Sequence, residues 1–390
     1  MRRPRIFDHN RYPVRRGNCV DLMVNGEIFY PRMLSAIINA KHTVILEQYL
    51  VKSGKVLDPF VEAFCNAAFR GVKVVILLDA YGSRALSAAD RERLQIANVS
   101  LHFYNPVRLY RLIGSLFRNH RKLLLVDGSV AFVGGAGIND EFLIPQKAFQ
   151  NSPWRDVMLE IKGPIIADWL DLFRYTLSRQ LTAKHDNIDW TAVTDQCNID
   201  DKDQQAQVLI ASALGRQEIS QAFLGRIHIA RRRVWLSTPY FVTTKKIRRA
   251  LIAAARRGVD TRLLLPGEFS DHPWVTYASQ RFYQNLLNAG VRIFEFQKGF
   301  SHSKIQLVDD WVSIGSCNLD RWNMHWNLDA NQAIASKRFA QTVADLLSND
   351  FALSQEIARD SWSRRSLVKR FKSLCSSFFV KIVEKFFSWF

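Results

Sequence analysis

The side chains best suited to chemistry in this sequence lie in a short stretch that occurs twice. The two copies are His120-Arg-Lys122-Leu-Leu-Leu-Val-Asp127 and His302-Ser-Lys304-Ile-Gln-Leu-Val-Asp309. Apolar runs of this kind predict a strand, and positions two apart on a strand share a face. Each histidine therefore points the same way as its lysine. Each aspartate follows at an odd spacing and is expected to brace the end of its strand, where Asp127-Gly128 predicts a tight turn.

A histidine beside a fixed lysine suits phosphoryl chemistry. The imidazole can attack phosphorus, and the ammonium offsets charge on the phosphate oxygens without a metal ion. Two copies supply two histidines, one to form a phosphohistidine and one to protonate the leaving oxygen. The alternative is two unrelated buried strands that each carry a histidine. The shared aspartate offset favours the catalytic interpretation, as does the Gly134-Gly135 or Gly315-Ser316 pair that follows each copy.

The composition predicts a globular protein with an anionic partner. The formal net charge of +18 suits nucleic acid, anionic lipid or a phosphorylated substrate. The five cysteines are scattered without paired spacing, so neither a zinc site nor a disulfide framework is expected, which fits a reducing compartment. The basic N-terminus has no apolar run behind it, and no stretch of about 18 apolar residues occurs anywhere. These features predict a soluble or peripheral protein.

The elements around the two motifs repeat in the same order, as expected of an internal duplication. Before the first motif, the pattern predicts strand, helix, strand and strand over 43–49, 58–70, 71–78 and 99–104, after a helix over 31–40. Before the second motif, it predicts the same order over 233–240, 246–257, 258–265 and 289–296. This alternation predicts an α/β fold with two lobes, joined by a polar linker over 184–205. With one motif in each lobe, a single site has to form where the lobes meet.

The pair of His-x-Lys-x4-Asp motifs resembles the phospholipase D superfamily. This resemblance implies two similar α/β lobes, over 1–183 and 206–355, that form one active site at their interface and use a phosphohistidine mechanism. It covers about residues 15–355 and is closest to bacterial cardiolipin synthases of the B type, which lack membrane-spanning helices. Supporting stretches are Gly17-Asn18, Asn25-Gly26-Glu27, Ile45-Leu46-Glu47, Trp154-Arg155-Asp156, Gly315-Ser316-Cys317-Asn318-Leu319-Asp320 and Asn327-Leu328-Asp329-Ala330-Asn331.

The resemblance also implies a role for each site residue and no metal or other cofactor. His120 would be the nucleophile and His302 the general acid, beside Lys122 and Lys304 as phosphate-binding groups. The remaining members are the motif aspartates Asp127 and Asp309, the phosphate donors Asn139 and Asn318, and the carboxylates Asp156 and Asp329, each of which would orient the histidine of the motif upstream of it. A histidine that must hold one tautomer needs such an anchor. For Asp156, a surface ion pair with Arg155 is the alternative.

Two departures from the family pattern bear on these roles. Gly137 occupies the usual asparagine position after the first motif, and Asn139 lies two residues later. This offset puts the contact between Asn139 and phosphate in doubt. After Asp309, five residues precede Gly315, one fewer than separate Asp127 from Gly134. The second strand pair is therefore expected to have an altered turn.

Residues 356–390 are predicted to form a basic amphipathic tail. From 364 onwards, apolar residues such as Phe371, Leu374 and Phe378 follow the spacing of one helix face, and lysines and arginines crowd the rest. This pattern is typical of an in-plane membrane anchor, to which each basic residue adds about 1 kcal/mol on anionic lipid. A helix packed on the protein body or a dimer contact are the alternatives. Residues 106–118 could rim the site and meet lipid headgroups, or form an ordinary basic segment.

The resemblance therefore implies a cardiolipin synthase acting on phosphatidylglycerol, with phosphatidylethanolamine as a further candidate donor. The phosphatidyl group would pass to His120 and then to a second phosphatidylglycerol, releasing glycerol. A phospholipase D that releases phosphatidic acid is the alternative. A nuclease of the same superfamily is less favoured because binding the DNA backbone requires no apolar face, and a non-catalytic membrane protein conflicts with two intact His-Lys pairs. The expected partner is an anionic membrane rather than nucleic acid, at the cytoplasmic face of the cell inner membrane.

Overall fold

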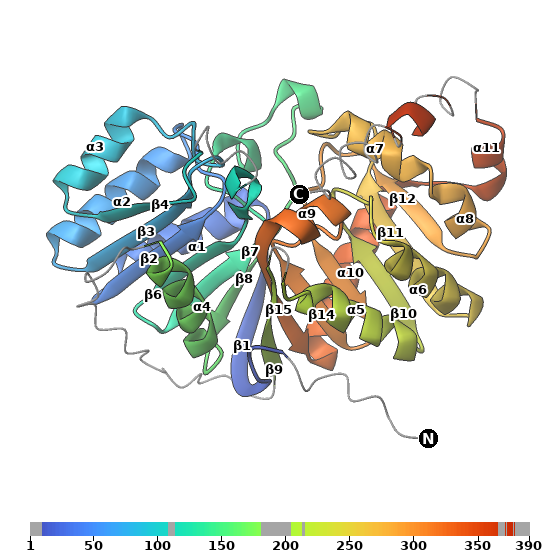
Figure 1. The fold of residues 1–390 in the computed structure, drawn as a ribbon, viewed down its shortest axis with the longest axis horizontal. Helices are drawn as coiled ribbons and strands as arrows, with labels where there is room; N and C mark the ends of the chain where they lie inside the picture. Colours follow the sequence, from blue (N-terminus) through green and yellow to red (C-terminus); the bar gives the residue numbers. More distant parts are fainter. Residues whose placement is uncertain are drawn as a thin grey trace.

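A computed structural model describes residues 10–107, 114–180, 204–212, 215–365, 371, 373–376 and 378. Figure 1 shows two lobes side by side, each a sheet covered by helices, with the strands β1 and β9 between them. The linker predicted over 184–205 lies outside the described residues except for its last two, and the basic segment 106–118 is described only at its ends. In the part of the chain that is described, no helix combines the length and apolar character that crossing a membrane requires.

The first lobe contains the elements from β1 to α4. They are β1 (Arg15–Val24), α1 (Gly26–Ile38), β2 (Thr43–Gln48), α2 (Leu57–Phe69), β3 (Lys73–Asp79), α3 (Ala88–Ile96), β4 (Ser100–Tyr104), β5 (Arg118–Asn119), β6 (Lys122–Val126), β7 (Val130–Gly134), β8 (Val157–Lys162) and α4 (Ile166–Ser178). Short 3-10 turns cover Gly114–Leu116, Asp140–Phe142 and Lys147–Phe149.

The second lobe contains the elements from β9 to α11. They are β9 (Gln204–Ala211), α5 (Glu218–Ile229), β10 (Arg233–Ser237), α6 (Lys245–Arg256), β11 (Asp260–Pro266), α7 (Pro273–Gln280), α8 (Tyr283–Leu287), β12 (Arg292–Phe296), β13 (Ile305–Val308), β14 (Trp311–Gly315), α9 (Arg321–Trp326), β15 (Asn327–Ala335), α10 (Lys337–Ala352), β16 (Ser354–Glu356) and α11 (Arg359–Ser363).

The two lobes share a strand order, which confirms the predicted duplication and the α/β fold. The order is β1-β8-β7-β6-β2-β3-β4 in the first lobe and β9-β15-β14-β13-β10-β11-β12-β16 in the second. Because β1 pairs with β9, both lobes belong to one continuous sheet. The strands β2, β3 and β4 are parallel to one another, as are β10, β11 and β12. Parallel strands covered on both faces have nearly uninterrupted apolar sequences, as in β3 and the second half of β11, whereas β4 is only half-buried.

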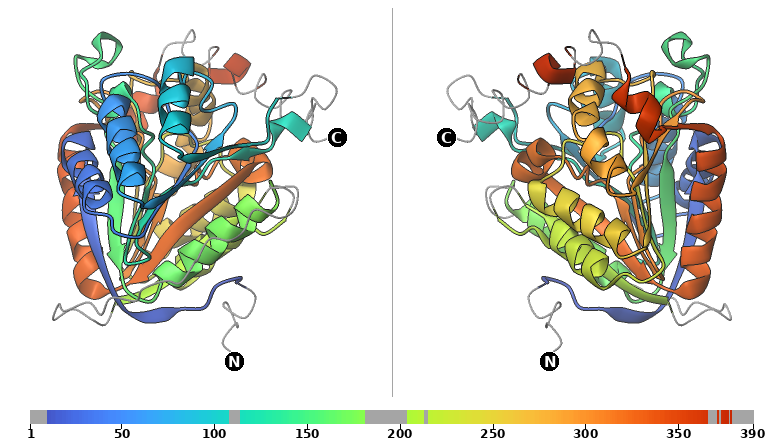
Figure 2. Two further views of the ribbon diagram at one scale, coloured as in Figure 1. Left: turned by 90° about the vertical axis from the view of Figure 1, so that its left-hand side faces the viewer. Right: turned by 90° about the vertical axis from the view of Figure 1, so that its right-hand side faces the viewer.

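Three apolar cores hold these layers together. The helices α1, α2 and α3 cover one face of the first lobe, where Phe60 is fully buried, and α5, α6 and α8 cover the second lobe around Phe223. The helices α4 and α10 pack into a core that both lobes share. Figure 2 shows these two helices on opposite sides of the strands. The indole N–H of Trp169 in α4 donates to Gln332 Oε1 in β15 at 2.8 Å, which joins the first lobe to the second.

The turns that close the two motif strands differ as predicted. Val126 pairs with Val130, so three residues connect β6 to β7, and Asp127 and Gly128 have φ angles of 51° and 59°. Val308 pairs with Trp311, so only two residues connect β13 to β14, and Asp309 has a φ of 51°. Aspartate tolerates this left-handed conformation because its short side chain can bond to nearby backbone.

Several local predictions need correction. The helix predicted over 31–40 begins earlier, at Gly26, and contains Pro31, and the strand predicted over 233–240 ends at Ser237. The predicted tail does not begin at 356, because Glu356 lies in β16 and pairs with Arg292 at 2.7 Å. Most of the tail beyond 365 lies outside the described residues.

The expectation that the cysteines form no disulfide framework needs a correction at one cysteine. Cys19 is disulfide-bonded, whereas Cys65, Cys317 and Cys375 are free. Spacing along the chain cannot reveal a pairing between distant cysteines, because such a bond depends on the fold.

Candidate active site

The two histidines lie where the lobes meet. His120 lies just before β6, and His302 lies just before β13. Each is held through its backbone by the opposite lobe. The backbone N–H of His120 donates to Leu328 O at 2.9 Å, and that of His302 donates to Arg155 O at 2.8 Å. The short strand β5, which ends at Asn119, pairs with β15 next to Leu328. The two motif starts are therefore positioned by contacts between the lobes.

Each histidine is hydrogen-bonded to a carboxylate from the other half of the chain, which corrects the expectation that it bonds the carboxylate downstream of its own motif. His120 Nδ1 lies 2.8 Å from Asp329 Oδ1, and His302 Nδ1 lies 2.7 Å from Asp156 Oδ2. Both aspartates are fully buried. The alternative interpretation of Asp156 as a surface ion-pair partner is wrong, because its neighbour Arg155 pairs instead with Asp350 at 2.6 Å.

These carboxylates select the tautomer of each imidazole. In the neutral ring, Nδ1–H donates to the carboxylate, which leaves a lone pair on Nε2. Burial and the Lys122 ammonium lower the pKa of His120 to about 4, although Asp329 partly offsets them. Burial and Lys304 also lower the pKa of His302, against the effect of Asp156. His120 is therefore neutral near pH 7, the form in which an imidazole can act as a nucleophile.

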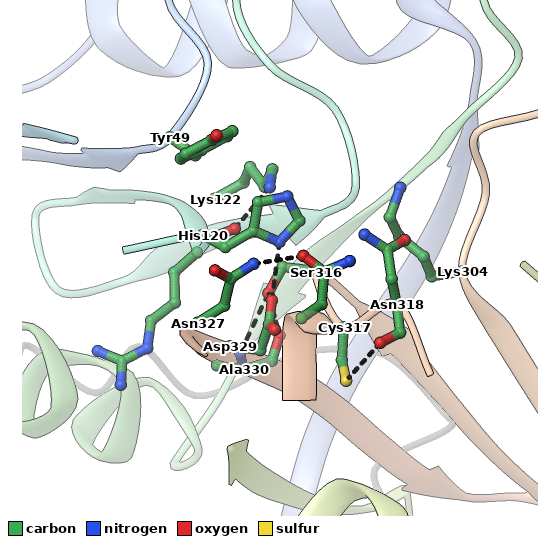
Figure 3. Close-up of polar contacts among 12 residues, drawn as sticks. Tyr49, His120, Lys122, Lys304, Ser316, Cys317, Asn318, Asn327, Asp329 and Ala330 are labelled. Carbon is green, nitrogen blue, oxygen red and sulfur yellow. Dashed lines mark hydrogen bonds and ion pairs between the residues drawn. The ribbon is translucent and has the colours of Figure 1, made fainter. Parts of the chain in front are cut away.

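Two buried ammonium groups stand beside the histidines. Burial lowers the pKa of Lys304 to about 8, and burial and repulsion from Lys304 lower the pKa of Lys122 well below its ordinary value. Lys304 Nζ lies 2.9 Å from His302 Nε2. Figure 3 shows Lys122 and Lys304 on either side of the His120 ring. Two cations that repel one another in a buried space favour an anion between them.

The two predicted asparagine donors differ in their surroundings. Asn318 is buried and lies beside Lys304 in Figure 3. Asn139 Oδ1 instead accepts from Glu141 N at 3.0 Å, and its Nδ2 has no hydrogen-bond partner among the described residues. That Nδ2 lies 3.0 Å from the place where a Cβ on Gly137 would stand. The Asn139 amide thus reaches the neighbourhood of the position that Gly137 leaves without a side chain.

The motif aspartates do not belong with the catalytic residues, which corrects the role that the resemblance implied. Each lies at the far end of its strand from the histidine and binds backbone N–H groups. The donors are Lys41, His42 and Thr43 for Asp127, each at 2.8 Å, and Arg231, Arg232 and Arg233 for Asp309, at 2.9–3.0 Å. Both carboxylates therefore brace the start of the neighbouring strand, as the odd spacing in the sequence indicated.

Sequence reasoning missed several side chains that shape the site. Ser316 Oγ donates to Asp329 Oδ1 at 2.7 Å and so fixes the carboxylate that holds His120. The Tyr49 ring lies 4.8 Å from the His120 ring, and the Trp154 ring lies 5.5 Å from the His302 ring. Ser316 and Trp154 stand in stretches that carried the family resemblance, but nothing in the sequence showed what they contact.

Comparison with known proteins identifies the family. The family model described as "Cardiolipin synthase, PLD-like domain" matches residues 33–171 and 223–351, which contain one motif each. This chain belongs to that phospholipase D-like family. A protein of Pseudomonas putida (strain GB-1) named cardiolipin synthase A is 34% identical over 94% of this chain and 76% of its own length. One of Pseudomonas aeruginosa (strain LESB58) with the same name is 33% identical over 93% of this chain and 72% of its own length. Both relatives are named as A-type cardiolipin synthases, so they do not support the resemblance to the B type in particular.

Solved structures of lower identity share the fold. The phosphatidylserine synthase of Haemophilus influenzae Rd KW20 superposes with a TM-score of 0.72 at 13% identity, over 96% of this chain and 95% of its own. A polyphosphate kinase from Porphyromonas gingivalis superposes with a TM-score of 0.58 at 14% identity, over 94% of this chain and 53% of its own. At these identities the likeness establishes the two-lobed architecture alone.

Proposed function

We propose that this protein is a cardiolipin synthase that joins two molecules of phosphatidylglycerol through a phosphohistidine intermediate and releases glycerol. The observation that carries the proposal is the pair of buried histidines, each hydrogen-bonded to a carboxylate of the other lobe and accompanied by a lysine. The names of the relatives favour phospholipids as the substrates.

In the first step, His120 Nε2 attacks the phosphorus of a phosphatidylglycerol. A P–N bond forms, the bond from phosphorus to the glycerol oxygen breaks, and His302 gives a proton to the departing oxygen. The phosphodiester bound between Lys122 and Lys304 is anionic, so it raises the pKa of His302 toward the protonated form that this step needs. Asp329 offsets the positive charge that develops on His120.

In the second step, the hydroxyl of another phosphatidylglycerol attacks the same phosphorus. His302 accepts the hydroxyl proton, the P–N bond breaks, and cardiolipin leaves with His120 restored. Transfer rather than hydrolysis requires that water be kept from the phosphoenzyme. The low exposure of His120 and His302, 7% and 8%, supports transfer. A phospholipase D activity is the second candidate, and a nuclease is less favoured because the relatives carry lipid-synthase names.

We place the protein at the cytoplasmic face of the inner membrane as a peripheral protein. Phe371, Leu374 and Phe378 are 67%, 57% and 64% exposed, and their spacing puts them on one helix face. Three exposed apolar side chains on a segment rich in lysine and arginine support a membrane-facing tail. Binding to anionic vesicles should therefore weaken on truncation after residue 365.

Lipid product analysis tests the proposed activity. The wild-type protein is incubated with phosphatidylglycerol vesicles, with and without phosphatidylethanolamine, beside His120→Ala, His302→Ala and the exposed-histidine control His228→Ala. Cardiolipin is expected from the wild type and His228→Ala but not from the other two. Phosphatidic acid without cardiolipin would identify a hydrolase. With labelled lipid, an adduct that is labile in acid and stable in base is expected on the wild type and absent from His120→Ala.

A further inference from the structure

Two second-lobe residues outside the motifs, Tyr240 and Asp271, lie beyond the same end of the strands as His302. The strand β10 pairs with β13, and Ser237 Oγ at its end lies 2.8 Å from Ser303 Oγ in the motif. Tyr240 follows three residues later. Asp271 follows the end of β11, the parallel neighbour of β10. Parallel strands have their carboxyl ends on the same side of the sheet, so the segments after β10 and β11 lie near one another.

The two side chains form a hydrogen-bonded pair with one unused oxygen. Tyr240 Oη donates to Asp271 Oδ2 at 2.5 Å, and His272 Nε2, at 3.8 Å from the same oxygen, is too far for a hydrogen bond. Asp271 Oδ1 is buried and accepts no hydrogen bond from any residue that the structure describes. The side chain as a whole is 18% exposed, and this exposure belongs to its other atoms because Oδ1 itself is buried. A buried carboxylate oxygen without a donor is unfavourable, so a ligand hydrogen-bond donor fits there.

This unused oxygen lies within electrostatic reach of the catalytic groups. The Asp271 charge raises the pKa values of His302 and Lys304, opposing the lowering that burial causes. Burial, followed by Asp271, raises the pKa of Tyr240 well above its ordinary value, so the phenol keeps its proton and remains a donor. The loop after Tyr240 is also tied to the segment after Asn318, because Arg321 N donates to Val242 O at 3.2 Å.

In the first lobe, Glu47 Oε2 is also buried without a hydrogen-bond partner among the described residues, but the carboxylate at the end of the strand that corresponds to β11 is fully bonded. Asp79 ends β3, the counterpart of β11, and its oxygens accept from the backbone N–H groups of Asn119, Tyr81 and Gly82 at 2.9–3.0 Å. Arg118 adds an ion pair at 3.3 Å. Asp79 is thus fully used in holding the segment before His120. Asp271 differs from Asp79 because its Oδ1 accepts no hydrogen bond from the described residues, which leaves that oxygen available to a ligand.

We propose that Asp271, oriented by Tyr240, accepts a hydrogen bond from a glycerol headgroup hydroxyl beside His302. The proposal rests on the proposed function. If His120 attacks in line, both the departing glycerol and the incoming phosphatidylglycerol hydroxyl lie opposite it, on the His302 side. One subsite then serves both alcohols. A neutral diol fits better than an ammonium headgroup because Lys304 already supplies a positive charge close to Asp271.

The partition of the phosphoenzyme between two alcohols tests this subsite. Phosphatidylglycerol vesicles are supplied with equal concentrations of 1,2-propanediol and 1-propanol, and the two phosphatidyl-alcohol products are counted. The ratio does not depend on how much protein is folded, because both products come from one intermediate. The variants are Asp271→Asn and Tyr240→Phe. The control Tyr12→Phe removes a similar tyrosine–aspartate bond, Tyr12 Oη to Asp171 at 2.8 Å, elsewhere in the fold.

The preference of the wild type for the diol is expected to fall about tenfold in Asp271→Asn and several-fold in Tyr240→Phe, while Tyr12→Phe leaves it unchanged. An unchanged ratio in Asp271→Asn would overturn the proposal. In a parallel assay, ethanolamine is supplied as the acceptor alcohol. A variant that no longer uses ethanolamine but keeps the preference for the diol would also overturn the proposal, since the carboxylate would then bind a cation.

The test separates this inference from the proposed function. If the wild type makes only phosphatidic acid, the synthase proposal fails but the subsite is still measurable. The hydrolysis rates of phosphatidylglycerol and phosphatidylpropanol are then compared, and Asp271→Asn should reduce the preference for phosphatidylglycerol by about tenfold. Equal preference in wild type and variant would overturn the subsite alone.

Discussion

Replacing Asp329 by asparagine should disable catalysis without unfolding the protein. The carboxylate is fully buried and accepts from His120 Nδ1 at 2.8 Å and from Ser316 Oγ at 2.7 Å. A hydrogen bond to a charged group contributes about 1.5–3 kcal/mol, which corresponds to roughly 10–150-fold in rate. The amide also no longer favours the tautomer with a free Nε2 lone pair. We therefore expect Asp329→Asn to lower kcat by about 100-fold or more.

The matched control is Asp127→Asn, which changes the aspartate of the first motif. Its carboxylate binds three backbone N–H groups and does not contact His120. We expect the free energy of unfolding to fall by about 1–3 kcal/mol, while kcat per folded molecule stays within about threefold of the wild type. Initial rates of cardiolipin formation and urea unfolding followed by circular dichroism measure the two quantities. A comparable loss of kcat in both variants, or an active Asp329→Asn protein, would refute the reasoning.

Two further predictions concern the second histidine. Because burial lowers the pKa of Lys304 to about 8, its ammonium loses a proton as the pH rises through that value, so kcat/KM should fall above about pH 8. In Lys304→Arg the guanidinium stays charged, so this fall in kcat/KM should move to higher pH. A pH profile unchanged by the substitution would contradict the assignment of the fall to Lys304. A Cβ on Gly135 would stand 2.6 Å from both carboxylate oxygens of Asp156. Gly135→Ala should therefore displace Asp156 from His302 and reduce kcat by about tenfold or more. A variant with the kcat of the wild type would contradict this prediction.

The crossed hydrogen bonds make the two halves of the chain interdependent. His120 needs Asp329 from the second lobe, and His302 needs Asp156 from the first. The continuous sheet through β1 and β9 and the shared core around α4 and α10 hold the lobes in the required relation. Duplication alone would place two histidine motifs in one chain. The packing between the lobes converts them into a single buried site.

The sequence by itself determined the features that depend on neighbours along the chain. Strand and helix periodicity located the elements before each motif, and the spacing of two placed each histidine beside its lysine. The odd spacing of Asp127 and Asp309 indicated that they brace strand ends, against the catalytic role implied by family resemblance. One fewer residue after Asp309 predicted the shorter turn. All of these depend on local backbone geometry, which a short segment specifies largely without the rest of the fold.

Only the tertiary structure decided which distant side chains meet. Nothing in the sequence showed that each histidine takes its carboxylate from the opposite half, that Ser316 holds Asp329, or that Tyr49 packs on His120. The same holds for the disulfide at Cys19 and for the unused oxygen of Asp271. Such contacts follow from how two lobes pack, and that packing is set by the summed burial of many side chains rather than by a local pattern.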